Sequence, residues 1–131
     1  RLGTLGHSDG DPVLHAVIDA ILGACAMGDI GEKFSDTDKK YKNINSTKLV
    51  EKVIKLIKKD GYVVNNIDIN IITETPRLKN FKKKITNNIA VLFKISPNYV
   101  NVKAKTAEKL GVIGNDKAIA AEVVASVIKH D

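Results

Sequence analysis

The sequence predicts an α/β (α+β) sandwich in which a small mixed β-sheet is covered by helices on one face. Two kinds of segment take turns along the chain. In one kind the apolar residues recur at helical spacing, and in the other apolar and polar residues alternate. There is no repeat, low-complexity stretch or Pro/Gly/Ser-rich linker, so residues 1–131 are expected to form one domain. An apolar content of 44% is enough to build one core.

Four helices are expected. The first covers residues 11–27, because Asp11 can cap the free amides, Pro12 suits the first helical position and Gly28 follows. The second covers residues 45–60 and ends at Gly61. The third and fourth are expected over residues 78–95 and 117–129 from their apolar spacing.

Two strands are expected between these helices. In residues 62–75 the apolar Ile67, Ile69 and Ile71 occupy every second position. Apolar residues also occupy every second position in residues 99–105. Because two strands make a sheet too small to stand alone, upstream strands or neighbouring subunits are expected to complete it.

Three clusters of residues could carry chemistry. His7, Ser8 and His15 flank a predicted helix start, where free amides and the helix dipole favour an anion. Residues 29–38 form a polar stretch, expected to be a long functional loop, whose aspartates could bind hydroxyl groups or cations. Residues 105–108 follow a strand, at a sheet edge where ligands commonly bind. Taken singly, the first two clusters are more often structural or solvated, and the third is equally compatible with an ordinary loop.

The formal charge of +6 does not by itself indicate a nucleic-acid partner. Of the 21 basic residues only Arg1 and Arg77 are arginine, and Lys, Asn and Ile, all with A/T-rich codons, are abundant. We therefore expect no nucleic acid, although a positive field would suit a phosphate-bearing small substrate. No apolar run is long enough to span a membrane, and the lone Cys25 is expected to be a small buried hydrophobe.

The same clusters, taken together, resemble a known family. His-Ser-Asp-Gly-Asp and Leu-His (residues 7–11 and 14–15), Gly-Asp-Ile-Gly with Phe-x-Asp-Thr-Asp (28–31 and 34–38) and Val-Lys-Ala-Lys-Thr-x-Glu-Lys-Leu-Gly (102–111) are similar, in order and spacing, to the signatures of the 2-C-methyl-D-erythritol 2,4-cyclodiphosphate synthase family. The resemblance covers essentially the whole chain. It implies a metal-dependent lyase of the non-mevalonate (MEP) pathway of isoprenoid precursor synthesis.

The implied reaction uses a nucleophile within the substrate. The 2-phosphate of 4-diphosphocytidyl-2-C-methyl-D-erythritol 2-phosphate attacks the β-phosphorus, closes a cyclic diphosphate and expels CMP. The protein then has to position the phosphates and neutralise their charge.

The resemblance also implies roles for individual residues. His7 and Thr106 match the pair that stabilises transition-state charge, His15 matches a ligand of Zn²⁺ or another divalent transition metal, and Glu108 matches the ligand of Mg²⁺ or Mn²⁺. The sugar and its phosphate are expected to contact Ser8, Asp29, Ile30, Gly31, Phe34, Ser35, Asp36, Thr37 and Asp38. The cytidine pocket is expected to comprise Thr73, Glu74, Thr75, Pro76, Arg77, Leu78, Lys79, Ala104, Lys105 and Thr106, and Ala107 and Glu108 are also expected to contact the substrate.

The family pattern further implies a homotrimer with active sites between subunits, and other MEP-pathway enzymes are candidate partners. Two zinc ligands of the family come from an Asp-x-His motif that this sequence lacks, so the N-terminal strand region is expected to be missing. The absent motif leaves open a scaffold or metal-free nucleotide-binding module, and charge alone leaves open an RNA-binding protein. The expected location is the bacterial cytoplasm or a plastid- or apicoplast-type organelle.

Overall fold

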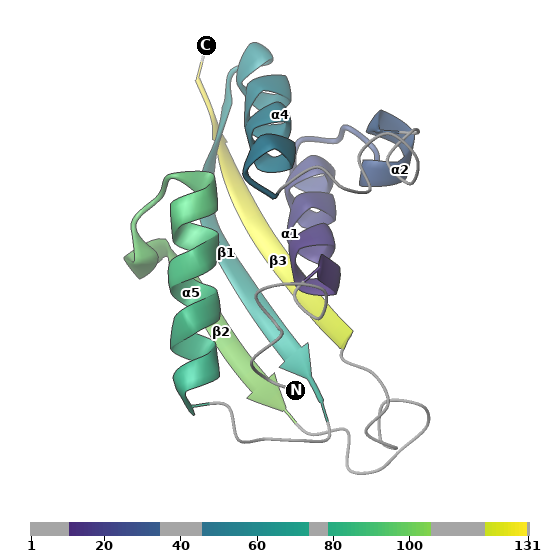
Figure 1. The fold of residues 1–131 in the computed structure, drawn as a ribbon. Coiled ribbons are helices and arrows are strands. Elements are labelled where there is room, and N and C mark those ends of the chain that lie inside the picture. Colours follow the sequence, from purple (N-terminus) through teal and green to yellow (C-terminus); the bar gives the residue numbers. More distant parts are fainter. Residues whose placement is uncertain (1–10, 35–45, 74–78, 106–119, 131) are drawn as a thin grey trace.

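The computed structural model describes residues 11–34, 46–73, 79–105 and 120–130. Three strands form one sheet, and the long helices lie on one side of it (Figure 1). The elements in chain order are α1 (Asp11–Ala24), α2 (Ile30–Lys33), α4 (Ser46–Lys59), β1 (Tyr62–Ile72), α5 (Lys79–Phe93), the 3-10 turn η2 (Pro97–Tyr99), β2 (Val100–Lys105) and β3 (Ala120–Lys129). The predicted sandwich with helices on one face is therefore confirmed for the described residues.

β1 is the central strand of a mixed sheet with the order β2-β1-β3. It runs parallel to β2 and antiparallel to β3, so the C-terminal ends of β1 and β2 meet at one edge of the sheet. Ile67, Ile69 and Ile71 are fully buried between this strand and the helices, as their alternation predicts.

A β-bulge in β1 explains why its buried positions change parity. Tyr62 and Val64 pack against the core, but the next buried position is Ile67 rather than residue 66. The register against β3 shifts between Val64 and Asn66, and the extra residue turns the following side chains over. The Asn65 Nδ2 donates a hydrogen bond to Ser126 Oγ at 2.9 Å, which ties the bulge to β3.

The prediction of a fourth helix over residues 117–129 is wrong, because residues 120–129 form β3. The segment contains four β-branched residues, which favour a pleated strand when a partner strand is present. Ala121, Val123, Ala125 and Val127 pack against the core, whereas the residues between them face away from it. This period of two was present in the sequence but was masked by the abundance of alanine, which favours helices.

The other helices agree closely with the sequence. α4 buries Leu49, Val50, Val53 and Ile57 on one face, and Gly61, with a φ of 88°, follows it. α1 stops at Ala24, three residues before the predicted end, because Ala26 takes a φ of 57° and leaves the helix. α5 and the strand β2 lie within their predicted ranges.

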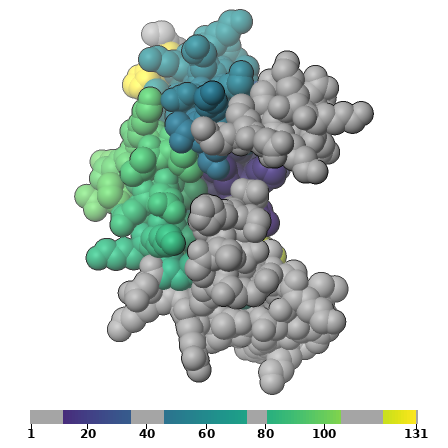
Figure 2. Space-filling view, in the orientation of Figure 1, coloured from purple at the N-terminus to yellow at the C-terminus, as the bar shows by residue number. Residues whose placement is uncertain are grey.

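The helical layer is built from α1, α4 and α5. Figure 2 shows α4 above α5 on one face of the molecule. Cys25 is buried, as predicted, and its burial, with the nearby charge of Asp60, raises the pKa of its thiol, which favours the protonated form. Among the described residues, none of the helices combines the length and apolar character that a bilayer crossing requires.

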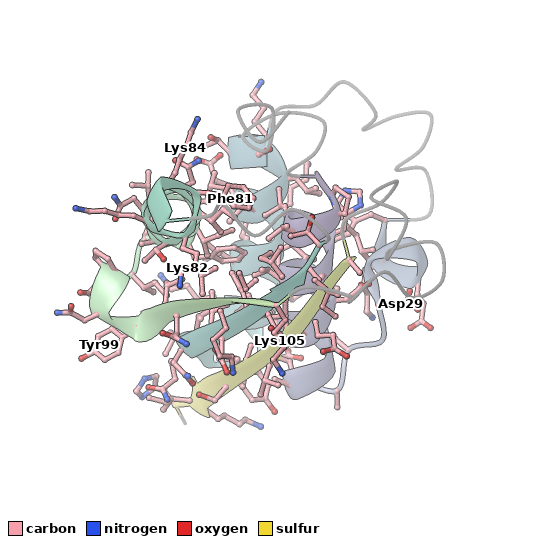
Figure 3. All side chains as sticks on the ribbon, turned by 90° about the horizontal axis from the view of Figure 1, so that it is seen from below. Asp29, Phe81, Lys82, Lys84, Tyr99 and Lys105 are labelled. Atoms are coloured by element: carbon pink, nitrogen blue, oxygen red, sulfur yellow. The ribbon has the colours of Figure 1, made fainter. Side chains whose placement is uncertain are left out.

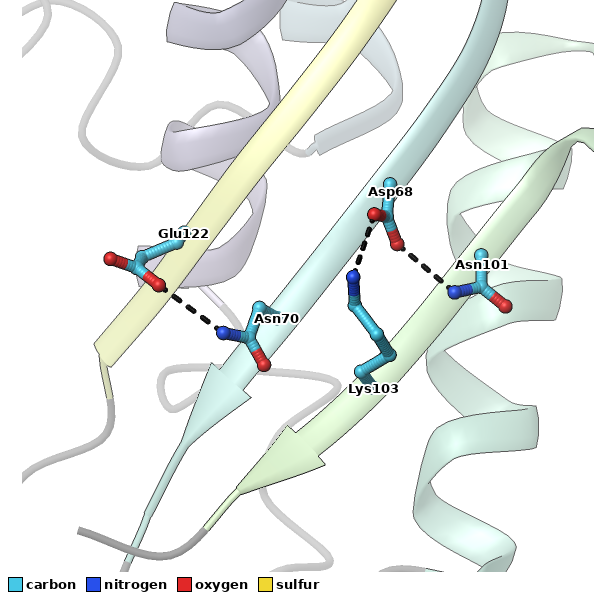
Figure 4. A network of polar contacts seen from close by, with 5 residues as sticks. All are labelled: Asp68, Asn70, Asn101, Lys103 and Glu122. Carbon is cyan, nitrogen blue, oxygen red and sulfur yellow. Dashed lines mark hydrogen bonds and ion pairs between the residues drawn. The ribbon is translucent and has the colours of Figure 1, made fainter.

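The opposite face of the sheet carries a polar network (Figure 4). Asp68 on β1 accepts hydrogen bonds from Lys103 Nζ at 2.9 Å and from Asn101 Nδ2 at 3.0 Å, both on β2. Asn70 Nδ2 donates to Glu122 on β3 at 3.2 Å, while its own Oδ1 is buried without a partner. Hydrogen bonds from Lys103 and Asn101 lower the pKa of Asp68 below its ordinary value.

Substitution of Ile69 by Ala should lower the free energy of unfolding by about 2–5 kcal/mol, since it removes a fully buried side chain from the central strand. Urea denaturation at a fixed protein concentration measures this change. Val91→Ala on α5 is the control, because Val91 is 75% exposed and its truncation should change stability by about 0.5 kcal/mol or less. Equal losses in the two variants would contradict the assigned core.

Substitution of Asp68 by Asn should cost up to about 1 kcal/mol at pH 7, because its ion pair with Lys103 is partly exposed. The native pKa lies below the ordinary 3.8, so the charged carboxylate stabilises the fold above pH 3.8 and this stabilisation is lost as the pH falls through the native pKa. Denaturation curves of both proteins from pH 7 to pH 2 should therefore converge toward low pH. A difference that grows on acidification would contradict the ion pair.

Candidate functional site

The predicted cytidine segments meet at the edge where β1 and β2 end. Ile72 pairs with Lys105 in the parallel register, and the backbone N–H of Thr73 donates to the carbonyl of Lys105 at 3.0 Å. Thr73 is buried, Lys105 is exposed and Ala104 packs against the core. The structure thus brings together two segments that lie about thirty residues apart in the sequence, at the edge of a sheet where ligands commonly bind.

The predicted sugar segment lies elsewhere in the molecule. Ile30 and Gly31 belong to the single-turn helix α2, so the expectation of a continuous loop over residues 29–38 is wrong at this turn. Figure 3 shows Asp29 at one side of the molecule, away from Lys105 at the end of β2. Within one chain, the described parts of the sugar and cytidine segments are therefore not brought together.

Asp29 begins α2 as its N-cap. The Asp29 Oδ1 accepts the backbone N–H of Glu32 at 2.7 Å, which satisfies an amide that has no partner within so short a helix. The Ile30 and Phe34 side chains are half-buried and pack against the core. One oxygen of the exposed Asp29 carboxylate suffices for this cap, so the other can accept a hydrogen bond from a ligand hydroxyl.

Asp19 on α1 also holds this turn, and it was not singled out from the sequence. Its Oδ1 accepts the backbone N–H of Ile30 at 2.7 Å. The bond joins residues that are eleven positions apart, and no local motif in the sequence predicts it. The only available signal is that Asp19 lies one helical turn beyond His15, on the same exposed side of α1.

The described residues do not by themselves form a metal site. His15 is exposed near the start of α1, and no group of three metal-ligating side chains occurs in the ranges that the structure describes. A zinc site in proteins needs at least three protein ligands. His15 therefore fits the role of a single ligand whose companions have to come from elsewhere.

Many of the predicted site residues lie outside the described residues. These are His7, Ser8, Ser35, Asp36, Thr37, Asp38, Glu74, Thr75, Pro76, Arg77, Leu78, Thr106, Ala107 and Glu108. Lys79 is the first residue of α5. The roles predicted for all of them remain predictions.

An open hollow of about 420 Å³ lies between α2 and α4. It is lined by Lys33, Phe34, Lys52, Lys55, Leu56 and Lys59. Four lysines thus share the lining of this hollow with the half-buried Phe34, one of the predicted sugar-site residues. The positive charge around this hollow favours a phosphate-bearing ligand.

Comparison with known proteins assigns the chain to a family. The model of the YgbB family matches residues 1–128. The 2-C-methyl-D-erythritol 2,4-cyclodiphosphate synthase of Clostridium botulinum (strain Alaska E43 / Type E3) is 49% identical over 127 residues, which cover 97% of this chain and 81% of that protein. The chain belongs to the 2-C-methyl-D-erythritol 2,4-cyclodiphosphate synthase family. The resemblance drawn from the three sequence motifs is thereby confirmed.

Two further members of the synthase family show the range of its architectures. The bifunctional enzyme IspD/IspF of Pelagibacter ubique (strain HTCC1062) is 66% identical over 130 residues, 99% of this chain but 35% of that protein. The chain thus spans about a third of the length of this bifunctional relative. The solved structure of IspF from Plasmodium falciparum in complex with CDP is 38% identical, with a TM-score of 0.79, and the match covers 95% of this chain and 75% of that one.

Substitution of Gly28 by Ala should lower the free energy of unfolding by about 1–2 kcal/mol, because Gly28 has a φ of 82°. An added Cβ would also clash with the Glu32 carboxylate, so Glu32 would have to move. Gly23→Ala within α1 is the matched control, since its Cβ would meet nothing within 4 Å and should stabilise the helix by up to about 1 kcal/mol. Thermal unfolding of both variants measures the contrast, and a stabilising Gly28→Ala would contradict the described turn.

Proposed function

We propose that this chain converts 4-diphosphocytidyl-2-C-methyl-D-erythritol 2-phosphate into 2-C-methyl-D-erythritol 2,4-cyclodiphosphate and CMP. The observation that carries the proposal is the family match over residues 1–128, which spans all three sequence motifs. The meeting of Thr73 and Lys105 at the end of the parallel strand pair supports it, because both belong to the segments assigned to cytidine. The name of the Plasmodium falciparum structure, a CDP complex, supports the same ligand class.

The residues have distinct tasks in this proposal. Asp29 and Phe34, at the two ends of α2, hold the methylerythritol part, and the edge at Thr73 and Lys105 holds the cytidine. His7 and Thr106 neutralise charge that develops on the phosphates as the substrate's own 2-phosphate attacks. No nucleophilic side chain is required, because the attacking oxygen belongs to the substrate.

Two metal ions belong to the proposal. His15 would be one ligand of Zn²⁺, together with ligands outside the described residues, and Glu108 would hold Mg²⁺ or Mn²⁺. Bound metal would supply a Lewis acid that withdraws charge from the phosphates. The residues of this chain bind and orient the substrate around that point.

We further propose that the working unit is a homotrimer. The sugar segment and the cytidine edge lie apart in one chain, but one substrate has to touch both, so neighbouring copies would bring them together. The sheet face opposite the helices has features that a neighbour would cover: exposed Val124 and Ile128, and the buried Asn70 Oδ1 without a partner.

The test is turnover by the full-length protein loaded with Zn²⁺ and Mg²⁺. Chromatography should detect release of CMP, and ³¹P NMR should detect formation of a cyclic diphosphate at the same time. His15→Ala should lower kcat/KM by at least about 100-fold, because even groups behind the ligands of metal sites commonly contribute 10- to 100-fold. His130→Ala is the control, since His130 is exposed and lies beyond β3, outside the proposed site. The kcat/KM of this variant should be unchanged.

Two results would contradict the proposal. Absence of CMP release by the metal-loaded protein would favour the scaffold or binding-module reading, and titration with CDP would then show whether nucleotide binding persists without catalysis. Equal losses in the His15 and His130 variants would remove the proposed role of His15 as a ligand.

A further inference from the structure

The turn that carries Asp29 depends on contacts from outside itself. α2 has four residues, and a helix of this length does not persist in water without tertiary contacts. The Asp29 cap on Glu32 stabilises the turn internally but does not fix where the turn lies. Burial of the Ile30 side chain restrains it only loosely, because apolar packing is non-directional.

Asp19 provides the directional contact. Its carboxylate accepts the Ile30 N–H at 2.7 Å, a length typical of a hydrogen bond to a charged acceptor. Ile30 is the first residue of α2, so this N–H has no partner within the helix. The bond therefore joins the beginning of α2, next to Asp29, to the middle of α1.

α1 also carries His15, one turn before Asp19 on the same exposed side. α1 is anchored in the core through Val17, Ile18 and Ile21, each fully buried. The bond from Asp19 thus places the Asp29 segment at a fixed position relative to a rigid helix that also bears the proposed metal ligand.

We propose that Asp19 is a positioning residue for the methylerythritol part of the substrate. Its carboxylate holds the Ile30 N–H and so fixes residues 29–31 for their contacts with the sugar. This inference rests on the proposed function and deepens it. Asp19 itself touches no substrate atom, and its effect should be confined to ligands that contain the methylerythritol group.

The experiment compares two ligands on the full-length, metal-loaded protein by isothermal titration. 2-C-methyl-D-erythritol 2,4-cyclodiphosphate contains the methylerythritol group, whereas CDP does not. Asp19→Ala should weaken binding of the cyclodiphosphate about 10-fold, the effect expected for loss of one hydrogen bond to a charged group. Binding of CDP should change less than about twofold, and in turnover KM should rise more than kcat falls.

Asp19→Asn tests whether the acceptor oxygen is what matters. An Asn side chain offers the same Oδ1 to the Ile30 N–H without the charge, so it should recover most of the cyclodiphosphate affinity. Glu51→Ala, which removes an exposed carboxylate from α4, is the matched control and should leave both affinities unchanged. Circular dichroism and thermal unfolding of each variant establish that it is folded.

The outcomes separate this inference from the function on which it rests. If the unmodified protein binds both ligands and Asp19→Ala keeps the same affinity for the cyclodiphosphate, the positioning role is overturned. The proposed function is then unaffected. Equal weakening of both ligands, or an Asn variant as impaired as Ala, would also overturn it, because the effect would then be general or purely electrostatic. Failure of the unmodified protein to bind either ligand and to release CMP would overturn the proposed function and this inference with it.

Discussion

The described fold depends on the burial of one face of β1. Ile67, Ile69 and Ile71 are fully buried, and among the described strands β1 alone is paired along both edges. Every long helix packs against the core cluster that these residues form, so the helices have their positions because β1 offers them an apolar surface. The parallel pairing with β2 then decides where the segments predicted to bind cytidine come together, since it places Thr73 beside Lys105. A packing constraint at the centre of the sheet thus sets the geometry of a site at its edge.

The segment predicted to bind the sugar is held differently, because polar contacts rather than apolar packing fix the orientation of its turn. Asp29 and Asp19 each accept a backbone N–H of α2 at 2.7 Å. Gly28 enters this turn with a positive φ, and the Glu32 carboxylate lies close against it. The turn is therefore held by a few specific atoms, in contrast to the strand edge, where a whole ladder of backbone bonds contributes.

Much of the fold was predictable because it rests on local periodicity. The apolar spacing of α4 and the alternation around Ile69 are each readable within one segment. The strand β3 was misread because its alanines satisfy a helical pattern as well, and only the neighbouring edge of β1 makes the strand the better solution. The bulge at Asn65 and the hydrogen bond that Ile30 donates to Asp19 depend on tertiary contacts, so no local pattern in the sequence predicts them. The motifs identified the family, but they did not indicate which parts of the predicted site a single chain can bring together.

The place of β3 in the chain has a consequence for synthesis. Residues 120–129 pair along β1 from Tyr62 to Ile72, so that edge of the central strand finds its partner only after about fifty further residues have been translated. At elongation rates of about 5–20 residues per second, synthesis of these residues takes several seconds, during which that apolar strand edge has no partner. The nascent chain therefore has a defined interval in which chaperone binding, or pairing with another emerging chain, competes with completion of the sheet.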